Sequence, residues 1–353
     1  MGTYTANLIL ALAQVDKLNE YVLFNAPDYL KRQLSNPHFH FVEVPYKNAA
    51  HYEQMLLPKA AKAEGVQLLH YVDNSCSLLT DLPIVLTLHD AMYTRPLKAI
   101  RLRPTLRQRL VYAYKKLTIP KSAWFAKKII TVSAYSKEQI LKETGVPADK
   151  VTVTLEAVDQ RLYTRTKHKP SGLFKILVHG AADDRKNLSN ILKAAKLMSL
   201  DKKSFQMLIM GMDKEELRCT HYERQALELG LEPYVKWVGN IPAEKLTQTY
   251  HEADLLLYPS RLEGFGLPVL EAFSCGIPVI TSNTTSLPEV AGKAAWLVDP
   301  EDPKEIAETV IKAMEKPALR RQLVERGLKR VKLFTWEKTA KETLTVYESI
   351  LNA

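Results

Sequence analysis

The chain has 353 residues, of which 46% are hydrophobic and 25% charged, and a formal net charge of +10. This composition excludes a disordered or low-complexity protein, and the length is sufficient for two domains with separate cores. No apolar run approaches the roughly 18 residues of a membrane-spanning helix. The N-terminal stretch lacks a basic region and the three cysteines match no metal or redox spacing, so we expect a cytoplasmic protein with reduced thiols.

Apolar strand-like runs alternate with helical patterns along the chain, which is typical of parallel α/β architecture. At the start, four apolar residues mark one face of a predicted helix: Leu8, Leu12, Val15 and Leu18. The strands predicted in the first half are 21–25, 39–45, 67–72, 84–88, 129–133 and 151–155, and the helices are 49–63, 105–117 and 136–144.

The stretch Thr164–Ser171 is polar, basic and poor in apolar residues, so it is the predicted interdomain linker. It separates an N-terminal domain over 1–165 from a C-terminal domain over 172–334. A final helix is predicted over Thr335–Leu351. The strands predicted in the second half are 174–179, 205–210, 235–238, 254–258 and 277–281.

The basic excess is concentrated in one segment. Between Ala91 and Lys137 there are twelve Lys or Arg and no Asp or Glu, and subtracting these twelve from +10 leaves −2 for the rest. Apolar residues such as Trp124 are interleaved, which predicts basic amphipathic helices that bind an anionic membrane surface through segment 95–128. A solvated basic face is the alternative. No nucleic-acid module is recognisable, so we expect no specific nucleic-acid partner.

The turn that follows the apolar run 254–260 carries the strongest functional signal. Glu263 precedes Gly264-Phe265-Gly266, and Pro268 suits the first turn of a helix, where a missing N–H costs nothing. The free N–H groups of such a helix start favour an anion, above all phosphate. Glu271, predicted in the first helical turn, and Glu263 are suited to accept hydrogen bonds from sugar hydroxyls. Phosphate flanked by hydroxyl-rich groups describes a nucleotide-sugar.

This arrangement resembles the retaining glycosyltransferases of family 4, whose motif of two glutamates with seven residues between them reads Glu263 to Glu271 here. The likeness continues through Cys275–Ile280, Thr285–Gly292 and Leu297–Pro300. The resemblance implies a GT-B fold, with two facing Rossmann-like domains and an interdomain cleft. In that family the N-terminal domain binds the acceptor, the C-terminal domain binds the nucleotide-sugar, and the last helix, here 335–353, packs back on the N-terminal domain.

One departure from the family concerns the N-terminal sheet. Related proteins have a strand and a glycine turn before the segment that resembles Gly2–Leu8. We therefore expect the first strand of this sheet to be missing.

A departing sugar diphosphate develops negative charge, so the donor site needs fixed cations. Arg185 and Lys186 follow strand 174–179, at the edge where open α/β sheets bind ligands. The resemblance makes Lys186 the phosphate lysine. Ala181 stands where many members carry an arginine, so Arg185 is expected to replace it.

The resemblance also places His89 beside the transferred sugar and the loop around Ile241 against the nucleobase. Asn74 and Ser133 lie at similar loop edges and are assigned structural roles. The predicted catalytic residues are His89, Glu263, Lys186 and Arg185, and the predicted donor-binding residues are Gly2, Gly180, Ile241, Gly264, Phe265, Gly266, Leu267 and Glu271.

We therefore expect a glycosyltransferase that moves a hexose from a nucleoside-diphosphate sugar to a hydroxyl, with the retained configuration that the resemblance implies. The C-terminal motifs are most similar to those of mannosyltransferases that use GDP-mannose. A lipid-linked saccharide or envelope polysaccharide is the expected acceptor, at the inner face of the membrane. With Arg185 and Lys186 present, no metal ion or other cofactor is expected.

Three alternatives remain open from the sequence. One is a transferase of the same family that uses a UDP-sugar, and another is a nucleotide-sugar epimerase of the same fold. The third is an inactive protein that binds the membrane surface, which Ala181 and the missing strand favour.

Overall fold

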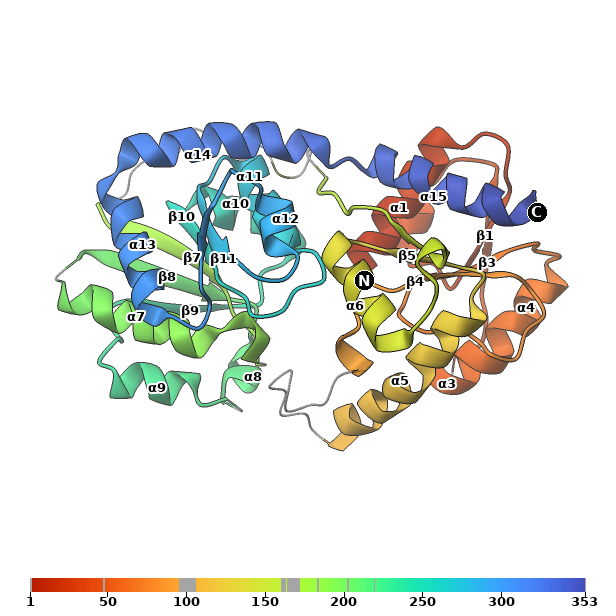
Figure 1. The fold of residues 1–353 in the computed structure, drawn as a ribbon, viewed down its shortest axis with the longest axis horizontal. Helices are drawn as coiled ribbons and strands as arrows, with labels where there is room; N and C mark the ends of the chain where they lie inside the picture. Colours follow the sequence, from red (N-terminus) through yellow and green to blue (C-terminus); the bar gives the residue numbers. More distant parts are fainter. Residues whose placement is uncertain are drawn as a thin grey trace. The chain divides into compact units, whose positions relative to one another are not determined.

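Figure 1 shows the computed structural model, which describes residues 2–46, 48–94, 106–159, 163, 172–182, 184–201, 203–218 and 220–352. The chain divides into two compact units. Unit 1 comprises Met1–Pro96, Pro104–Glu156 and Thr335–Ala353, and unit 2 comprises Leu97–Arg103 and Ala157–Phe334. The predicted linker, Thr164–Ser171, lies outside the described residues. The last helix belongs to unit 1, although all of unit 2 precedes it in the sequence.

Unit 1 contains two separate parallel sheets. In the first, β1 (Tyr21–Phe24) pairs with β2 (Phe39–Val42). The second has the order β3-β4-β5-β6, and its strands are β3 (Leu69–Tyr71), β4 (Ile84–Thr87), β5 (Lys128–Thr131) and β6 (Val151–Val153). No ladder joins β1 to β3 among the described residues. The strands of unit 1 are thus divided into two groups.

The helices of unit 1 cover these strands. They are α1 (Gly2–Val15), α2 (Asp28–Gln33), α3 (Ala49–His51), the π-helical turn η1 (Tyr52–Leu56), α4 (Leu57–Ala63), η2 (Met92–Thr94), α5 (Leu106–Phe125), α6 (Ala134–Thr144), η3 (Ala148–Lys150) and α15 (Trp336–Leu351). Figure 1 shows α1 and α15 side by side, and they contact each other along their lengths. Thr335 caps α15 by accepting a hydrogen bond from the N–H of Lys338.

Two predictions in unit 1 were wrong. Leu18 lies beyond α1 and is 90% exposed, because the Asp16 carboxylate accepts the N–H groups of Leu18 and Asn19 in a turn that ends the helix. The helix predicted over 105–117 continues as α5 to Phe125, through an internal proline. Ile119 on that extension is fully buried, so core packing compensates for the hydrogen bond that proline removes.

Unit 2 is built on one six-stranded parallel sheet with the order β12-β11-β10-β7-β8-β9. Its strands are β7 (Phe174–His179), β8 (Phe205–Met210), β9 (Val235–Gly239), β10 (Leu255–Tyr258), β11 (Val279–Ser282) and β12 (Trp296–Val298). The sequence predicted all of these except β12. The parallel α/β class is therefore confirmed. Both units contain parallel sheets, and the loops at the carboxyl edge of such a sheet are suited to ligand binding.

The helices of unit 2 are η4 (Asp184–Lys186), α7 (Leu188–Leu200), α8 (Lys214–Arg218), α9 (Tyr222–Glu228), α10 (Ala243–His251), α11 (Leu267–Cys275), α12 (Leu287–Ala291), α13 (Pro303–Glu315), α14 (Pro317–Arg330) and η5 (Val331–Leu333). α7 and α13 pack against each other and share one apolar core with β7, β8 and β10. α11 instead contacts β10, β11 and α14. Cys76 in unit 1 and Cys275 in unit 2 are buried free thiols. Within the described part of the chain, no helix combines the length and apolar character needed to cross a membrane.

A glycine allows α14 to approach α11 closely. Gly327 is buried, and a Cβ atom at this position would lie 2.6 Å from Cδ1 of Phe273 on α11. Phe273 is itself 1% exposed, so its ring has no free space into which to move. α14 also contacts the end of α12, where Arg330 donates to the carbonyls of Glu289 and Val290. Gly327 therefore sets the position of α11.

We expect Gly327→Ala to lower the free energy of unfolding by about 1–3 kcal/mol, because the overlap with Phe273 outweighs the better helix propensity of alanine. The thermal midpoint should fall by several degrees. Gln322→Ala, at an exposed position of the same helix, is the matched control and should change stability by less than about 0.5 kcal/mol. Denaturant unfolding measures both. A Gly327→Ala variant as stable as the unmodified protein would contradict this packing argument.

Candidate active site

The turn between β10 and α11 forms the base of the candidate site. Gly266 has φ +118°, and a Cβ there would meet Cδ2 of Leu287 at 2.7 Å, so this position requires glycine. Pro268 occupies the first turn of α11, and Gly276 ends the helix with φ +72°. Because α11 begins at Leu267, Glu271 lies in the second turn. The prediction that it lies in the first turn was wrong.

The Glu263 carboxylate is the most heavily bonded group of this turn. Its Oε1 atom accepts hydrogen bonds from Lys186 Nζ at 2.7 Å, from the Tyr258 hydroxyl at 2.7 Å and from the Ser260 hydroxyl at 2.5 Å. Burial alone would raise the pKa of Glu263, but the Lys186 ammonium and these hydrogen bonds outweigh it and hold the pKa below its usual value. Glu263 therefore stays ionised although its side chain is only 13% exposed.

Lys186 reaches this carboxylate from the loop after β7, the strand that pairs with β10. It ends η4, directly after β7, and its ammonium contacts both Glu263 and the hydroxyl of Tyr258, the latter at 2.5 Å. The Lys186 side chain is 20% exposed. Arg185 lies beside it, and its carbonyl accepts hydrogen bonds from Ser260 and Arg261. The predicted cationic pair thus lies at the carboxyl edge of β7, next to the glycine turn.

Glu271 is held by two tyrosines. The Tyr250 hydroxyl donates to its Oε2 atom at 2.6 Å, and the Tyr163 hydroxyl donates to its Oε1 atom at 3.0 Å. Burial raises the pKa of Glu271 above its usual value, although the two phenols partly oppose this effect. The two glutamates of the motif therefore have opposite pKa shifts, because only Glu263 has an ammonium in direct contact.

His179 is a member of this cluster that the sequence did not predict. Its Nε2 atom lies 2.9 Å from the Tyr250 hydroxyl, and its ring contacts Tyr258 edge-on. Burial, helped by the nearby Lys186 ammonium, lowers the pKa of His179 to about 3, so the imidazole is neutral at physiological pH. The signal was present in the sequence, because a histidine at the carboxyl end of an apolar strand is the pattern that identified His89. Tyr250 and Tyr163 gave no such signal.

Other predicted donor-binding residues lie in the loops along this edge of the sheet. A Cβ on Gly180 would meet Met212 Cε at 2.9 Å, and the Gly180 carbonyl would lie 2.7 Å from a Cβ on Gly211, so the two glycines allow close backbone approach. Ile241 is half-buried in the loop after β9. Phe265 is 4% exposed, and its carbonyl accepts a hydrogen bond from Ser286. Gly264 and Leu267 complete the turn into α11.

Two predicted site residues, Gly2 and His89, belong to unit 1. Gly2 is the first residue of α1. His89 follows β4, and its Nδ1 atom lies 3.2 Å from Oε1 of Glu156. Its ring packs edge-on against Tyr4 of α1, with the centroids 4.8 Å apart. The half-buried imidazole therefore has a fixed orientation.

The two residues that the sequence assigned to structural roles also lie in unit 1. Asn74 accepts the His89 N–H through its side chain at 2.8 Å, and it adopts φ +43°. Ser133 caps α6 by accepting the Ser136 N–H. Asn74 thus positions His89, which gives its structural role a direct connection to the predicted site.

We expect Glu263→Gln to lower the free energy of unfolding by about 3–5 kcal/mol at pH 7, because Lys186 then remains as a buried charge without its counter-ion. The native pKa of Glu263 is depressed. The ionised carboxylate therefore contributes its full stabilisation to the free energy of unfolding above the usual glutamate pKa of about 4.3. This stabilisation is lost as the pH falls through the pKa of Glu263 in the native protein. The difference in free energy of unfolding between the unmodified protein and Glu263→Gln should therefore narrow below roughly pH 4.

Urea unfolding at pH 7 and at steps down to pH 3 measures this gap. The Lys186→Met/Glu263→Gln double variant is the control, and it should recover part of the loss because no unpaired charge remains. A stability gap that does not change with pH would contradict the assigned ion pair.

Two family models match the chain. The model described as "Glycosyl transferases group 1" matches residues 159–330, and the model described as "Glycosyltransferase Family 4" matches residues 1–161. The chain is 32% identical over 249 residues to O-antigen chain mannosyltransferase B of Escherichia coli, covering 67% of this chain and 64% of that protein. It is 28% identical to the MMP alpha-(1→4)-mannosyltransferase of Mycolicibacterium hassiacum, covering 63% and 54%. The matches thus span less than two thirds of these relatives.

Solved structures share the fold. Sucrose-phosphate synthase from Thermosynechococcus elongatus has a TM-score of 0.77 at 21% identity, covering 99% of this chain and 93% of that one. Anabaena Alr3699/HepE in complex with UDP and glucose has a TM-score of 0.72 at 18% identity, covering 98% and 96%. At these identities the likeness shows the GT-B fold alone. With family models matched along residues 1–330, the chain belongs to the group 1 glycosyltransferases of family 4.

Proposed function

We propose that the protein transfers a hexose, namely mannose from GDP-mannose, to a hydroxyl of an envelope polysaccharide or lipid-linked saccharide, with retention of configuration. The observation that carries this proposal is the cluster of Lys186, Glu263 and Glu271 at the amino end of α11. It combines a lysine, the amino end of a helix and two carboxylates within one unit. That combination matches the parts of a nucleoside-diphosphate sugar.

Each group in the cluster has a role in this proposal. Lys186 and Arg185 stabilise the negative charge that develops on the leaving diphosphate, together with the N–H groups of the glycine turn. Glu271 binds a hydroxyl of the donor. Its Oε1 atom has the geometry for this role, since it accepts a hydrogen bond from the Tyr163 hydroxyl. Glu263 keeps Lys186 in position and contacts the donor sugar. The leaving diphosphate itself takes the acceptor proton on the same face of the sugar.

His89, a residue of unit 1, is the remaining residue to which the proposal assigns a role. Its ring is oriented by Glu156 and Tyr4, and we assign it to a hydroxyl of the transferred sugar. The cationic residues neutralise the negative charge of the diphosphate, as a divalent ion otherwise would, so we propose transfer without a metal or further cofactor.

The choice of donor rests on the relatives. Both of the curated relatives described above are mannosyltransferases by name, which favours mannose over other hexoses. The name of the Escherichia coli relative also supports a cell-envelope saccharide as acceptor. A UDP-sugar is the competing donor, since one structural neighbour is a complex with UDP and glucose.

We expect GDP and GDP-mannose to raise the thermal midpoint by about 5 °C or more at a hundred times their dissociation constant, since such binding contributes about 2.7 kcal/mol. Lys186→Ala and Glu271→Ala should each remove this shift and reduce turnover at least about a hundredfold. Glu325→Ala, on the exposed side of α14, is the control and should keep both. A panel of GDP, UDP and ADP with their hexose conjugates, without metal, identifies the base. A thermal midpoint that does not change with any of these nucleotides would contradict the proposed donor site.

We also propose that α5 docks on an anionic membrane at the cytoplasmic face. Leu117, Lys121 and Trp124 are exposed and are spaced by four and three residues, so they share one face of the helix. Leu117 is 68% exposed and Trp124 56%. Exposed apolar residues beside lysines suit the interface of anionic lipids. Residues 95–105 of the proposed membrane segment, including Arg101 and Arg103, lie outside the described residues.

Arg109→Ser/Lys116→Ser/Lys121→Ser should weaken binding to phosphatidylserine-containing vesicles, because each cation near such a surface contributes about 1 kcal/mol. The control carries the same loss of charge on α13 and α14, as Lys304→Ser/Lys312→Ser/Lys329→Ser. Co-sedimentation at physiological salt compares the two. Equal binding of the two triple variants would contradict the assignment to α5 and leave only the net charge as the cause.

A further inference from the structure

Both oxygen atoms of the Glu271 carboxylate accept hydrogen bonds from tyrosine hydroxyls of unit 2. The Tyr250 hydroxyl donates to Oε2 at 2.6 Å, and the Tyr163 hydroxyl donates to Oε1 at 3.0 Å. The two tyrosine rings also contact each other edge-on, with their centroids 6.0 Å apart. A donor hydroxyl that binds this carboxylate, as the proposed function requires, must therefore share or replace one of these two partners.

Tyr250 belongs to a chain of hydrogen bonds in which every proton is assigned. A phenol has one proton, and Tyr250 gives it to Glu271, so the Tyr250 oxygen accepts from the Nε2 atom of His179, 2.9 Å away. Burial lowers the pKa of His179 to about 3, so the neutral imidazole has a single N–H, and this contact places it on Nε2. His179 thus donates to Tyr250, which donates to Glu271.

Displacing Tyr250 would break this chain at two points. Oε2 of Glu271 would lose its donor and His179 would lose its acceptor, and a buried polar group without a partner is costly. The Tyr250 side chain is fully buried, so water does not reach it to replace either bond. The bond between Tyr250 and Oε2 of Glu271 is therefore the one that the fold retains.

Tyr163 is the more easily exchanged partner. Its side chain is half-buried, and its hydrogen bond to Glu271 is the longer of the two. A hydroxyl near the surface can exchange a protein acceptor for water at little net cost. Burial raises the pKa of Tyr163, and the nearby Glu271 carboxylate raises it further, so the phenol keeps its proton. It donates to Oε1 as a sugar hydroxyl would.

The bond from Tyr163 also keeps Oε1 in the form that accepts hydrogen bonds. Burial raises the pKa of Glu271, and the hydrogen bonds from the two phenols oppose this effect. A carboxyl group that took up a proton at Oε1 would present a donor there instead of an acceptor. A phenol on Oε1 therefore favours the ionised carboxylate that a hydroxyl ligand needs.

We propose that Tyr163 is an internal placeholder for a donor hydroxyl, and that Glu271 presents Oε1 to the ligand and Oε2 to the fold. Before the donor binds, the Tyr163 phenol donates to Oε1. A hydroxyl of the nucleoside-diphosphate sugar takes over this bond, and the Tyr163 hydroxyl moves to solvent. Tyr163 thus lowers the affinity of the site for its donor. This inference rests on the proposed function, which makes Glu271 a ligand of the donor.

Tyr163→Phe and Tyr250→Phe are a matched pair, since each removes one phenolic hydroxyl from the same carboxylate and keeps the ring. We expect Tyr163→Phe to tighten the binding of GDP-mannose by about threefold to tenfold, because apparent affinity rises with the fraction of protein in which the ligand-binding atom is accessible. Tyr250→Phe should weaken binding by at least about threefold, because Oε2 then lacks its donor. Titration calorimetry at about pH 8, well above the usual glutamate range, measures both. Parallel titrations with UDP-glucose cover the competing donor.

The thermal midpoint without nucleotide separates the placeholder from a purely structural role. Each variant loses one hydrogen bond, so both midpoints should fall by a few degrees. Tyr163→Phe should therefore be less stable and yet bind the donor more tightly, whereas a purely structural role would lower both stability and affinity. Because Tyr163 is only half-buried, its variant is expected to fold, and it decides the proposal even if Tyr250→Phe does not fold.

Fluorine NMR of protein labelled with fluorotyrosine observes the displacement directly. The Tyr163 signal is the one that is missing from the spectrum of Tyr163→Phe. Saturating GDP-mannose should move this signal toward the position of fluorotyrosine in water, because the phenol leaves the carboxylate. A Tyr163 signal that does not move when the nucleotide sugar binds would overturn the proposal.

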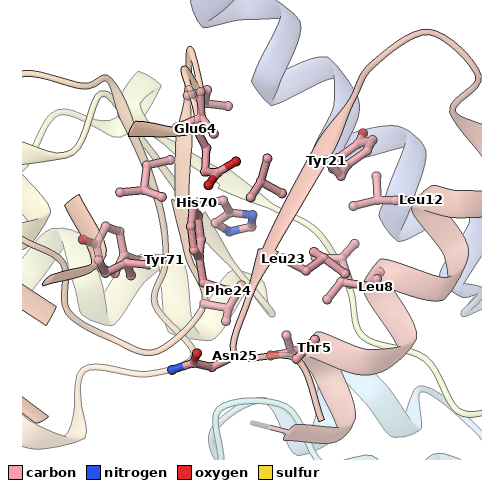
Figure 2. A pocket seen from close by; sticks show the side chains of 18 of the residues that line it. Thr5, Leu8, Leu12, Tyr21, Leu23, Phe24, Asn25, Glu64, His70 and Tyr71 are labelled. Carbon is pink, nitrogen blue, oxygen red and sulfur yellow. The ribbon is translucent and has the colours of Figure 1, made fainter. Parts of the chain in front are cut away.

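Unit 1 offers a second space large enough for a nucleotide, and binding there has to be distinguished. A cavity of about 860 Å³ lies between β1 and β3, and Figure 2 shows Leu8 and Leu12 of α1 and Leu23 of β1 along it. Ligand pockets commonly have about 300–1,000 Å³. Glu271 is not among the described residues that line this cavity, so Tyr163→Phe/Glu271→Ala is the control. This double variant should lose the gain in affinity.

The outcomes separate this inference from the proposed function. Equal or weaker binding by Tyr163→Phe, with clear binding by the unmodified protein, would overturn the placeholder and leave the proposed function standing. A gain that persists in Tyr163→Phe/Glu271→Ala would also overturn the placeholder, since the ligand would not be bound at Glu271. If neither the unmodified protein nor Tyr163→Phe bound GDP, UDP, ADP or their sugar conjugates, the proposed function would fail and the placeholder with it.

Discussion

The ion pair between Lys186 and Glu263 is the interaction on which the candidate site depends. It connects the end of β7 with the turn after β10, and the same carboxylate accepts hydroxyl hydrogen bonds from Tyr258 and Ser260. A carboxylate with so little exposure stays ionised only when cations and donors surround it, because burial alone favours the protonated form. The conformation of the glycine turn, and with it the start of α11, follows from satisfying this one charge.

Around this pair, unit 2 gives two glutamates of one motif different chemical characters. Glu263 faces an ammonium and has a depressed pKa, whereas Glu271 faces two phenols in a buried site and has a raised pKa. His179 remains neutral in contact with Tyr250 and Tyr258, two of the three tyrosines that donate hydrogen bonds to these carboxylates. An edge with one firmly charged carboxylate and one hydroxyl-binding carboxylate suits a ligand that carries both phosphate and sugar hydroxyls. Packing maintains this difference, since Gly327 allows α14 to pack closely against Phe273 of α11.

Unit 1 uses the same parallel architecture but differs in how the sheet is joined. In unit 2, β7 pairs on both sides, with β10 and β8, whereas the strands of unit 1 form two groups around a cavity. His89 is nevertheless positioned by several elements, since Asn74, Glu156 and Tyr4 all contact it.

The sequence by itself determined the parallel α/β class, most strands of both units, and the glycine turn with its two glutamates. These features have local causes: the strands of a buried parallel sheet are continuous apolar runs, and Gly266 and Pro268 specify a helix start. Strands 174–179 and 205–210 agree with the structure residue for residue. The sequence did not find β12, whose residues Trp296 and Leu297 are only partly buried or exposed.

Only the tertiary structure decided which side chains meet the two glutamates. Tyr163 and Tyr250 reach Glu271 from positions 108 and 21 residues away, and no local pattern distinguishes them from other tyrosines. The opposite pKa shifts of Glu263 and Glu271 have the same origin, because burial and charge at a carboxyl group depend on distant segments. Local sequence specifies backbone conformation, whereas the environment of an ionisable group is the sum of contacts that only the folded chain brings together.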